Sequence, residues 1–348
     1  MSMTKVVVTG AGGFIGHHLV SFLKQRGYWV RGVDIKTPEY ARTDADEFEL
    51  LDLREQANAL KATRGVDEVY ALAADMGGMG YISSHHAKIL HGNVLINAHT
   101  IEAARVNGAS RYLFTSSACI YPEFRQTSIQ ATPLKEEDAY PAQPQDAYGW
   151  EKLLTERLCT HYRQDYGLET RIVRFHNIYG PLGSWAGGRE KAPAALCRKV
   201  ATAKLTGNTD IEIWGDGEQT RSFCYVDDCV AGIYRLMRSD HRTPLNLGDD
   251  RLVSINQLAD MIARIAAVRI TKKHVEGPQG VRGRNSDNSL VSQALGWKPQ
   301  LSLEEGLDRT YSWIEQRVRE RLVLDADGSA DTDDGVLVRD SRGSQVGG

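Results

Sequence analysis

Tyr148 and Lys152 stand four residues apart at the start of a stretch with helical periodicity that runs to Tyr166. On a helix this spacing puts both side chains on one face, with the ammonium near the phenol. A neighbouring cation favours the phenolate and lowers a tyrosine pKa from its usual value of about 10. Tyr148 is therefore a candidate general base for a substrate hydroxyl. A surface Tyr–Lys pair on an amphipathic helix is the alternative interpretation.

A glycine-rich turn, TGAGGFIG at residues 9–16, follows the strand-like run Lys5–Thr9 and opens a helix-like run. Glycines in this pattern allow a tight turn, a close approach of the backbone to a pyrophosphate and close packing of the helix on the strand. The N-terminus of the helix then offers N–H donors to phosphates. The predicted cofactor contacts in the turn are Gly10, Gly13, Phe14, Ile15 and Gly16.

An acidic residue, Asp34, ends the next strand-like run, Trp29–Val33. A carboxylate at this spacing suits the two ribose hydroxyls of NAD and repels a 2′-phosphate. NAD is the predicted cofactor, and Lys36 keeps NADP open as a minor alternative. Together with Tyr148, this predicts oxidation of a carbinol carbon, with the proton passing to the Tyr148 phenolate and hydride passing to NAD⁺.

These residues need elements to position them, and apolar strand-like runs alternate with helical stretches through the first half of the chain. The predicted strands are Lys5–Thr9, Trp29–Val33, Glu68–Leu72, Arg111–Thr115 and Arg171–Arg174, with helices at Asn93–Asn107 and Tyr148–Tyr166. This alternation predicts an α/β fold, a Rossmann-type doubly wound parallel sheet. A smaller mixed α/β substrate-binding domain is expected beside it, with a helix at Ala194–Ala203 and a strand at Glu212–Trp214.

The predicted cofactor domain covers residues 1–176 and returns at roughly 222–250, where Asn246-Leu247-Gly248 rejoins the main sheet. Residues 177–221 and 251–320 form the predicted substrate domain. Its first part is irregular and rich in Gly and Pro, as binding loops often are. Residues 325–348 are acidic and Gly/Ser-rich, which favours a disordered tail.

The composition argues against several classes of protein. The 348 residues carry a net charge of −3, and we find no basic run with interleaved aromatic residues, so no nucleic-acid binding is predicted. No apolar run approaches the roughly 20 residues that span a bilayer. Five cysteines without a CxxC favour reduced thiols and a cytoplasmic protein. The ten histidines show no zinc spacing, so no metal is predicted.

Motifs spread along the chain carry a resemblance that is more specific than the fold. They are AADMGGMG (73–80), SSACIYPE (116–123), PQDAYG (144–149), RFHNIYGP (174–181), GGREKAPAA (187–195), WGDG (214–217), TRSF (220–223) and VRGRNSD (281–287). The chain resembles the extended short-chain dehydrogenase/reductase superfamily and, within it, the GDP-mannose 3,5-epimerase family. The resemblance runs from about residue 4 to about residue 318 and implies GDP-mannose and its epimers as ligands.

The resemblance implies that oxidation at C4 of the sugar gives a ketone, which acidifies the hydrogens on C3 and C5. Two further acid/base groups then exchange these protons from opposite faces, and the resemblance assigns them to Cys119 and Lys191. Ser117 is expected to hydrogen-bond the C4 oxygen, with Ser116 as a structural neighbour. A buried, inert cysteine and a solvated charge run at Arg189–Lys191 are the alternatives.

The resemblance also implies the remaining contacts. The cofactor contacts are Asp52, Leu53, Ala73, Tyr148 and Lys152, although Asp52 could equally be an exposed loop carboxylate. The substrate contacts are Met76, Gly77, Asn177, Lys191, Lys199, Arg221 and Arg282. Arg284 competes with Arg282 for the diphosphate, and His176 is expected to be structural rather than catalytic.

Two enzymes on the same fold compete with this interpretation. A nucleotide-sugar 4,6-dehydratase is expected to carry an Asp-Glu pair where this chain has Ala118-Cys119. A simple 4-epimerase would leave Cys119 and Lys191 without a task. A non-catalytic NAD-binding scaffold is expected to lose the Tyr–Lys pair, which this chain keeps.

The superfamily further implies a homodimer through Asn93–Asn107 and Tyr148–Tyr166.

Overall fold

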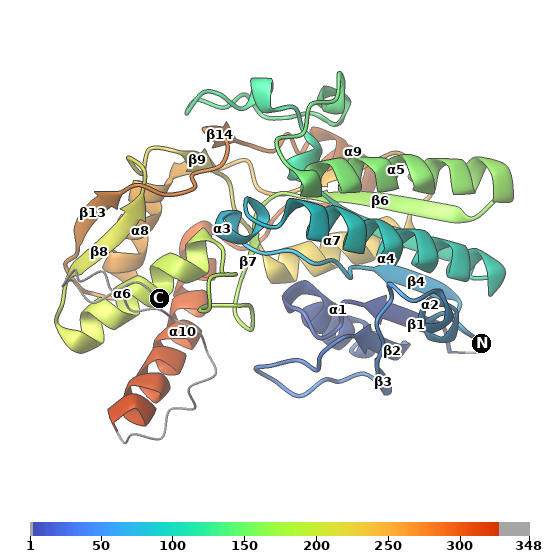
Figure 1. Ribbon diagram of the computed structural model, residues 1–348, viewed down its shortest axis with the longest axis horizontal. Coiled ribbons are helices and arrows are strands. Elements are labelled where there is room, and N and C mark those ends of the chain that lie inside the picture. Colours follow the sequence, from blue (N-terminus) through green and yellow to red (C-terminus); the bar gives the residue numbers. More distant parts are fainter. Residues whose placement is uncertain (1–2, 327–348) are drawn as a thin grey trace, which may run out of the picture.

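The computed structural model describes residues 3–326 (Figure 1). A seven-stranded sheet with the order β11-β6-β5-β4-β1-β2-β3 forms its centre, and every neighbouring pair in it is parallel. Its strands are β1 (Lys5–Thr9), β2 (Trp29–Asp34), β3 (Glu47–Leu50), β4 (Glu68–Ala71), β5 (Arg111–Ser117), β6 (Glu169–Phe175) and β11 (Leu245–Leu247). The chain reverses its direction across the sheet between β1 and β4, where such folds bind ligands.

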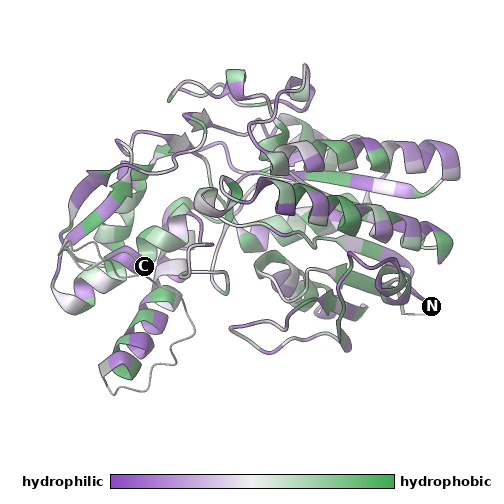
Figure 2. Ribbon diagram, in the orientation of Figure 1, coloured by the Kyte–Doolittle hydropathy of each residue, from purple (hydrophilic) through white to green (hydrophobic). Residues whose placement is uncertain are grey.

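Helices cover both faces of the sheet, because its buried strands are apolar on both sides. In β1, Val6 and Val8 pack with α1 (Phe14–Lys24) and α7 (Val226–Arg238). Val7 points to the other face, toward α2 (Gln56–Ala62), α4 (His86–Val106) and α5 (Ala147–Tyr166). Figure 2 shows these strands as largely hydrophobic, whereas the helices mix polar and apolar residues. The predicted doubly wound sheet is confirmed.

A second group of elements lies beside the carboxyl ends of the strands (Figure 1). Its helices are α3 (Met79–Ile82), α6 (Ala192–Thr206), α8 (Ile255–Ile265) and α10 (Leu303–Ala326), whereas α9 (Ser289–Leu295) packs against β11 and α7 of the sheet domain. Its strands pair as β8 (Asp210–Trp214) with β13 (Thr271–Val275), β7 (Ile178–Tyr179) with β10 (Cys224–Tyr225), and β9 (Thr220–Arg221) with β12 (Val253–Ser254) and β14 (Gly283–Arg284). Three short 3₁₀ turns precede α5, namely η1 (Ala118–Ile120), η2 (Glu123–Arg125) and η3 (Glu136–Ala139).

Most predicted elements agree with the structure to within a few residues, and β11 does return to the main sheet. The largest difference is α4, which begins at His86 rather than at Asn93, because its N-cap, His85, makes no side-chain cap that the sequence could reveal. The tail expected from residue 325 lies outside the described residues, except for Asp325 and Ala326, which end α10.

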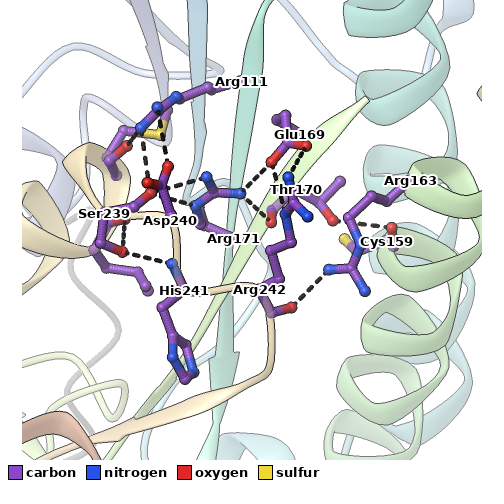
Figure 3. A network of polar contacts seen from close by, with 12 residues as sticks. Arg111, Cys159, Arg163, Glu169, Thr170, Arg171, Ser239, Asp240, His241 and Arg242 are labelled. Carbon is purple, nitrogen blue, oxygen red and sulfur yellow. Dashed lines mark hydrogen bonds and ion pairs between the residues drawn. The ribbon is translucent and has the colours of Figure 1, made fainter. Parts of the chain in front are cut away.

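A polar network ties the end of α7 to the amino ends of β5 and β6 (Figure 3). Arg171, which is only 1% exposed, donates to the Ser239 carbonyl at 2.9 and 3.0 Å and pairs with Glu169 at 2.9 Å. Arg242 also pairs with Glu169, at 2.8 Å. Cations suit the carbonyl end of a helix, and the network fixes the connection that leads from α7 into β11.

Candidate active site

The glycine turn lies at the carboxyl end of β1 and starts α1. Gly10 has φ +72°, and a Cβ there would lie 2.9 Å from the backbone of Leu72 and Ala73. A Cβ on Gly16 would lie 2.1 Å from the Gly10 carbonyl oxygen, so α1 packs directly on the turn. No side chain caps α1, whose N-cap is Gly13, so the N–H groups of Phe14 and Ile15 in its first turn face no capping side chain. These features fit the pyrophosphate of a dinucleotide.

Asp34 ends β2, and its carboxylate lies against the turn. Its Oδ2 accepts from the Gly12 N–H at 2.9 Å, and its Oδ1 accepts from the Ile35 N–H at 2.7 Å. Burial raises the pKa of the Asp34 carboxyl, and the backbone donors oppose that rise. Gly12 also belongs to this contact although it was not predicted, because a Cβ there would lie 2.1 Å from the Lys36 carbonyl oxygen. The additional glycine in the turn was the available signal.

Three further predicted cofactor residues follow β3 and β4. Asp52 pairs with Arg54 at 2.5 Å, which lowers the pKa of the Asp52 carboxyl. Leu53 is buried, and the Ala73 N–H donates to the Thr9 hydroxyl at 3.1 Å. All three therefore lie at the same edge of the sheet as Gly10 and Asp34.

Tyr148 and Lys152 lie in the first turns of α5. The Asp146 carboxylate caps this helix by accepting from the Gly149 N–H at 2.8 Å. The Lys152 Nζ lies 5.4 Å from the centroid of the Tyr148 ring and is only 2% exposed. The expected proximity of the ammonium to the tyrosine is therefore present, inside the protein rather than on its surface.

The charge balance around Tyr148 differs from the sequence argument. Glu151, which was not predicted, is fully buried with its Oε1 3.7 Å from the Lys152 Nζ. Burial raises the pKa of Tyr148 well above its usual value, and the Glu151 carboxylate adds to that rise. A hydrogen bond with Ser117 acts in the opposite direction. The expected lowering of the Tyr148 pKa is therefore absent in the protein alone, mainly because the phenol is buried and also because the Glu151 carboxylate lies nearby.

Cys119 follows β5 in η1 and packs beside Tyr148 and Met76 in one small apolar cluster. Its N–H donates to the Ser117 hydroxyl at 3.2 Å. A Cβ on Gly149 would lie 2.2 Å from the Cys119 carbonyl oxygen, so α5 contacts η1 directly. The structure thus brings together Tyr148, Ser117 and Cys119, three of the predicted catalytic residues.

Lys191 is the N-cap of α6 and reaches the same region from the second group of elements. Protein surrounds its amine closely enough that burial lowers the pKa of Lys191. The nearby Cys119 and Cys229 thiols oppose this shift. Two proton-handling groups, Cys119 and Lys191, therefore lie within electrostatic reach of each other.

Arg221 and Arg284 form a cationic pair next to Cys119. Arg284 donates from Nη1 to the Cys119 Sγ at 3.4 Å. Arg221 donates only to backbone carbonyls, including Val281 at 2.6 Å, and burial together with Arg284 lowers its pKa to about 9. Within residues 3–326, neither guanidinium has a carboxylate within salt-bridge distance, so the pair suits an anionic ligand.

The other predicted substrate residues lie in different environments. Arg282 makes a bidentate pair with Asp216 at 2.7 and 2.8 Å. The Lys199 Nζ donates to the Glu212 carbonyl at 2.5 Å, and burial lowers the pKa of Lys199. Asn177 has φ +42° and donates to the Ser222 carbonyl at 2.9 Å. A Cβ on Gly77 would lie 2.9 Å from the Cβ of Tyr81, so a side chain there would displace that residue first.

Two residues that the sequence analysis set aside have structural partners. Ser116 donates to the Glu156 carboxylate at 2.5 Å inside the core. His176 is buried against the Asn246 amide oxygen at 3.0 Å, and burial lowers the pKa of His176 to about 3.

In the described part of the chain, no cluster of three His, Cys, Asp or Glu residues could hold a metal ion. No helix of that part is long and apolar enough to cross a membrane.

Comparisons with known proteins agree with this geometry. GDP-mannose 3,5-epimerase of Arabidopsis thaliana is 52% identical over 328 residues, which are 93% of this chain and 86% of the relative. GDP-L-fucose synthase of Escherichia coli strain K12 is 29% identical and matches 90% of this chain and 97% of its own length.

Solved structures share the fold. UDP-glucose 4-epimerase of Thermotoga maritima superposes with a TM-score of 0.80 at 25% identity, over 90% of this chain and 100% of that chain. UDP-glucuronic acid 4-epimerase of Bacillus cereus, solved with UDP-glucuronic acid and NAD, gives a TM-score of 0.76 at 26% identity, over 90% of this chain and 100% of that chain. Residues 6–248 match the NAD dependent epimerase/dehydratase family. The chain belongs to that family and groups within it with the GDP-mannose 3,5-epimerases.

Proposed function

We propose that this protein epimerises GDP-D-mannose at C3 and C5, giving GDP-L-galactose, GDP-L-gulose or both. The observation that carries the proposal is the meeting of Tyr148, Cys119 and Lys191 in one region. A dehydrogenase step at C4 requires one proton acceptor, whereas exchange at neighbouring ring carbons requires additional acids and bases. The 52% identity to the Arabidopsis thaliana epimerase supports the same substrate.

NAD is the cofactor of the family, and the glycine turn with Asp34 fits it. When bound, NAD⁺ supplies the acceptor for the hydride from C4 and later returns it. Tyr148, as the phenolate that the positive charge of bound NAD⁺ favours, takes the proton of the C4 hydroxyl, while Ser117 holds the same oxygen by a hydrogen bond. Lys152 supplies positive charge on the Tyr148 side, while Asp52, Leu53 and Ala73 line the adenosine end.

The ketone at C4 makes the hydrogens on C3 and C5 acidic, because the resulting enolate delocalises charge onto oxygen. One of Cys119 and Lys191 removes such a proton from one face, and the other returns a proton from the opposite face. The lowered pKa of Lys191 makes its neutral amine available as a base closer to neutral pH. Met76 and Gly77 border the hexose in this arrangement.

For the diphosphate, we favour Arg284 together with Arg221 over Arg282, whose guanidinium is engaged by Asp216. Lys199 and Asn177 remain candidate contacts of the same nucleotide. Substitution Arg221→Met is expected to raise KM for GDP-mannose at least tenfold, while Arg282→Met has a smaller effect. Equal effects of the two substitutions on KM would contradict this assignment.

We also propose the two-domain division at residues 1–176 with 222–250, and 177–221 with 251–320. A homodimer through α4 and α5 is supported by their exposed apolar side chains, which include Leu90, Trp150 and Leu154. Light scattering should give twice the chain mass, and Trp150→Glu should give the monomer.

The net charge of −3 and the free thiols support a cytoplasmic protein that binds neither nucleic acid nor membranes.

The direct test of the activity is to incubate the purified protein with GDP-α-D-mannose, without added cofactor, and to identify the sugar products by NMR. GDP-L-galactose or GDP-L-gulose is the expected product. A hexose inverted only at C4 would indicate a simple 4-epimerase, and a 4-keto-6-deoxy sugar would indicate a dehydratase. Either product would refute the proposed function.

A further inference from the structure

Arg189 fastens the loop that carries Lys191 to the loop that follows β4. Its Nη1 donates to Asp75 Oδ1 at 3.2 Å and to the Met76 carbonyl at 3.4 Å. Its own carbonyl accepts from the Gly78 N–H at 3.0 Å. Both the backbone and the side chain of Arg189 therefore hydrogen-bond to residues 75–78.

The ring of Tyr81 packs against the Arg189 guanidinium as well. The guanidinium carbon of Arg189 lies 3.9 Å from the centroid of the Tyr81 ring. The Tyr81 hydroxyl donates to both oxygens of Asp75, at 2.9 and 3.0 Å. A planar guanidinium can stack on a ring and bind a carboxylate at once, whereas an ammonium cannot do both in this geometry.

The backbone just before Arg189 is open rather than packed. Gly187 and Gly188 have φ of +84° and +81°, and a Cβ on either would meet no atom within 4 Å. By contrast, a Cβ on Gly78 would lie 2.5 Å from the Glu190 carbonyl oxygen. The loop contacts the segment after β4 through Arg189 and Glu190, and α6 holds it as well, because Arg198 pairs with Glu190 at 2.8 Å and donates to the Trp185 carbonyl at 3.0 Å.

Further hydrogen bonds lead from Asp75 to α4 and α5. The Asp75 N–H donates to the Asn93 amide oxygen at 2.7 Å, and the Asn93 amide donates to Glu151 Oε1 at 3.0 Å. Glu151 Oε1 lies 3.7 Å from the Lys152 Nζ. The segment that Arg189 contacts is therefore itself anchored to α4 and α5, by hydrogen bonds that do not involve the Arg189 side chain.

We propose that Arg189 is a positioning residue, which holds Lys191 in place against the sugar ring by clamping its loop onto Asp75 and Tyr81. The inference rests on the proposed function, in which Lys191 exchanges ring protons. Arg189 transfers no proton itself. A displacement of an acid/base group by about 1 Å can cost on the order of 10²-fold in rate. An exposed ion pair contributes little to folding, so the clamp can be removed without unfolding the protein.

The clamp also affects how Lys191 titrates. Burial lowers the pKa of Lys191, while Cys119 from η1 and Cys229 from α7 face it and oppose that shift. The neighbouring charges on its own segment are Arg189 and Glu190, the latter paired with Arg198 at 2.8 Å. Opening the loop would hydrate the amine and raise its pKa toward the ordinary value for lysine, so the activity that needs the neutral amine would move to higher pH.

The test compares Arg189→Gln, Arg189→Lys and a matched control, Arg251→Gln. Arg251 is 48% exposed and pairs with Glu304, whereas Arg189 is 47% exposed and pairs with Asp75. Each variant is incubated with GDP-mannose in D₂O across a range of pH. NMR follows deuterium at C3 and C5, and the near-ultraviolet absorbance of reduced nicotinamide follows oxidation at C4.

We expect Arg189→Gln to slow deuterium incorporation by about 10²-fold, to move its pH dependence upward and to leave C4 oxidation within a few-fold of the unmodified protein. The rate of deuterium incorporation by Arg189→Lys should lie between the rates of Arg189→Gln and the unmodified protein. Arg251→Gln should match the unmodified protein. Equal losses of exchange and of C4 oxidation, or an unchanged pH dependence, would overturn the inference. If Arg189→Gln fails to fold, Asp75→Asn removes the charged acceptor and is judged by the same measurements. An unmodified protein that exchanges no deuterium would instead refute the proposed function itself.

Discussion

At the scale of single residues, the proposed site depends on which charges have partners inside the protein. Arg282 is engaged by Asp216, whereas Arg221 and Arg284 have no carboxylate within salt-bridge distance in the described part of the chain. A buried cation without a counter-ion is costly unless a ligand supplies one. The VRGRNSD motif alone could not separate Arg282 from Arg284, because Asp216 lies far from it in the sequence.

The partners of Glu151, like those of Arg282 and Arg284, could not be predicted from the sequence. Its position next to Lys152 is visible in the sequence, but adjacent residues on a helix normally point to different sides. Only the packing of α4 against α5 shows that Asn93 and Asn97 hold its carboxylate, with donor–acceptor distances of 3.0 and 3.1 Å. The pairing of Tyr148 with Lys152 was predictable from its spacing, whereas the charge balance around it was not.

Removal of either proposed ring acid/base group should separate the two halves of the reaction. Cys119→Ala and Lys191→Met are each expected to slow deuterium incorporation at C3 and C5 by about 10²–10⁴-fold, because general acid/base catalysis contributes on that order. Oxidation at C4 should persist, since Tyr148 is intact. Cys159→Ala, which changes a buried thiol between α5 and the sheet, is the control. Parallel loss of C4 oxidation in both variants would argue against separate roles.

At the scale of elements, the sequence predicted six of the seven strands of the central sheet, because each is a short apolar run bounded by turn residues, and it missed β3. Outside that sheet, the two-residue strands β7, β9, β10, β12 and β14 were not predicted, since each is defined by its pairing with a distant segment. These short strands carry Arg221 and Arg284. The geometry of the proposed diphosphate site was for that reason beyond reach of the sequence alone.

The contact of α5 with η1 gives a prediction about one glycine. In Gly149→Ala, the new Cβ would lie 2.2 Å from the Cys119 carbonyl oxygen, so the backbone must move and Cys119 shifts relative to Tyr148. We expect kcat to fall by roughly 10²-fold with a smaller change in KM. Gly92→Ala in α4 is the control, because its Cβ would meet only the Arg54 side chain at 3.8 Å. Normal turnover by Gly149→Ala would contradict the importance of this contact.

At the scale of the whole molecule, one edge of the sheet gathers residues from β1, β2, β4 and β5, while the loop before α6 closes over it. The sequence predicted this edge because parallel strands share it, and the motifs follow successive strands. The position of Lys191 was assigned by resemblance only, since its loop belongs to no periodic element. The cofactor end of the predicted site therefore rests on strand and turn patterns in the sequence, whereas its sugar end rests on resemblance.

Global stability should depend on pH through His176, which joins the ends of β6 and β11. Burial lowers its pKa to about 3, whereas an unfolded histidine titrates near 6.5. The unfolded chain therefore binds an extra proton between these values, and the free energy of unfolding should fall by on the order of 4 kcal/mol as pH drops through that window. Denaturant titrations of the unmodified protein and of His176→Gln should show a shallower pH slope in the variant. Identical slopes would mean that His176 is not the source.

The measurement that tests the central claim most directly is NMR of GDP-α-D-mannose incubated with the purified protein in D₂O, without added cofactor. The account predicts deuterium at both C3 and C5, together with new signals of GDP-L-galactose or GDP-L-gulose. Exchange at C5 alone would show that only half of the proposed chemistry occurs. No exchange at either carbon, even after NAD⁺ is added, would contradict the account.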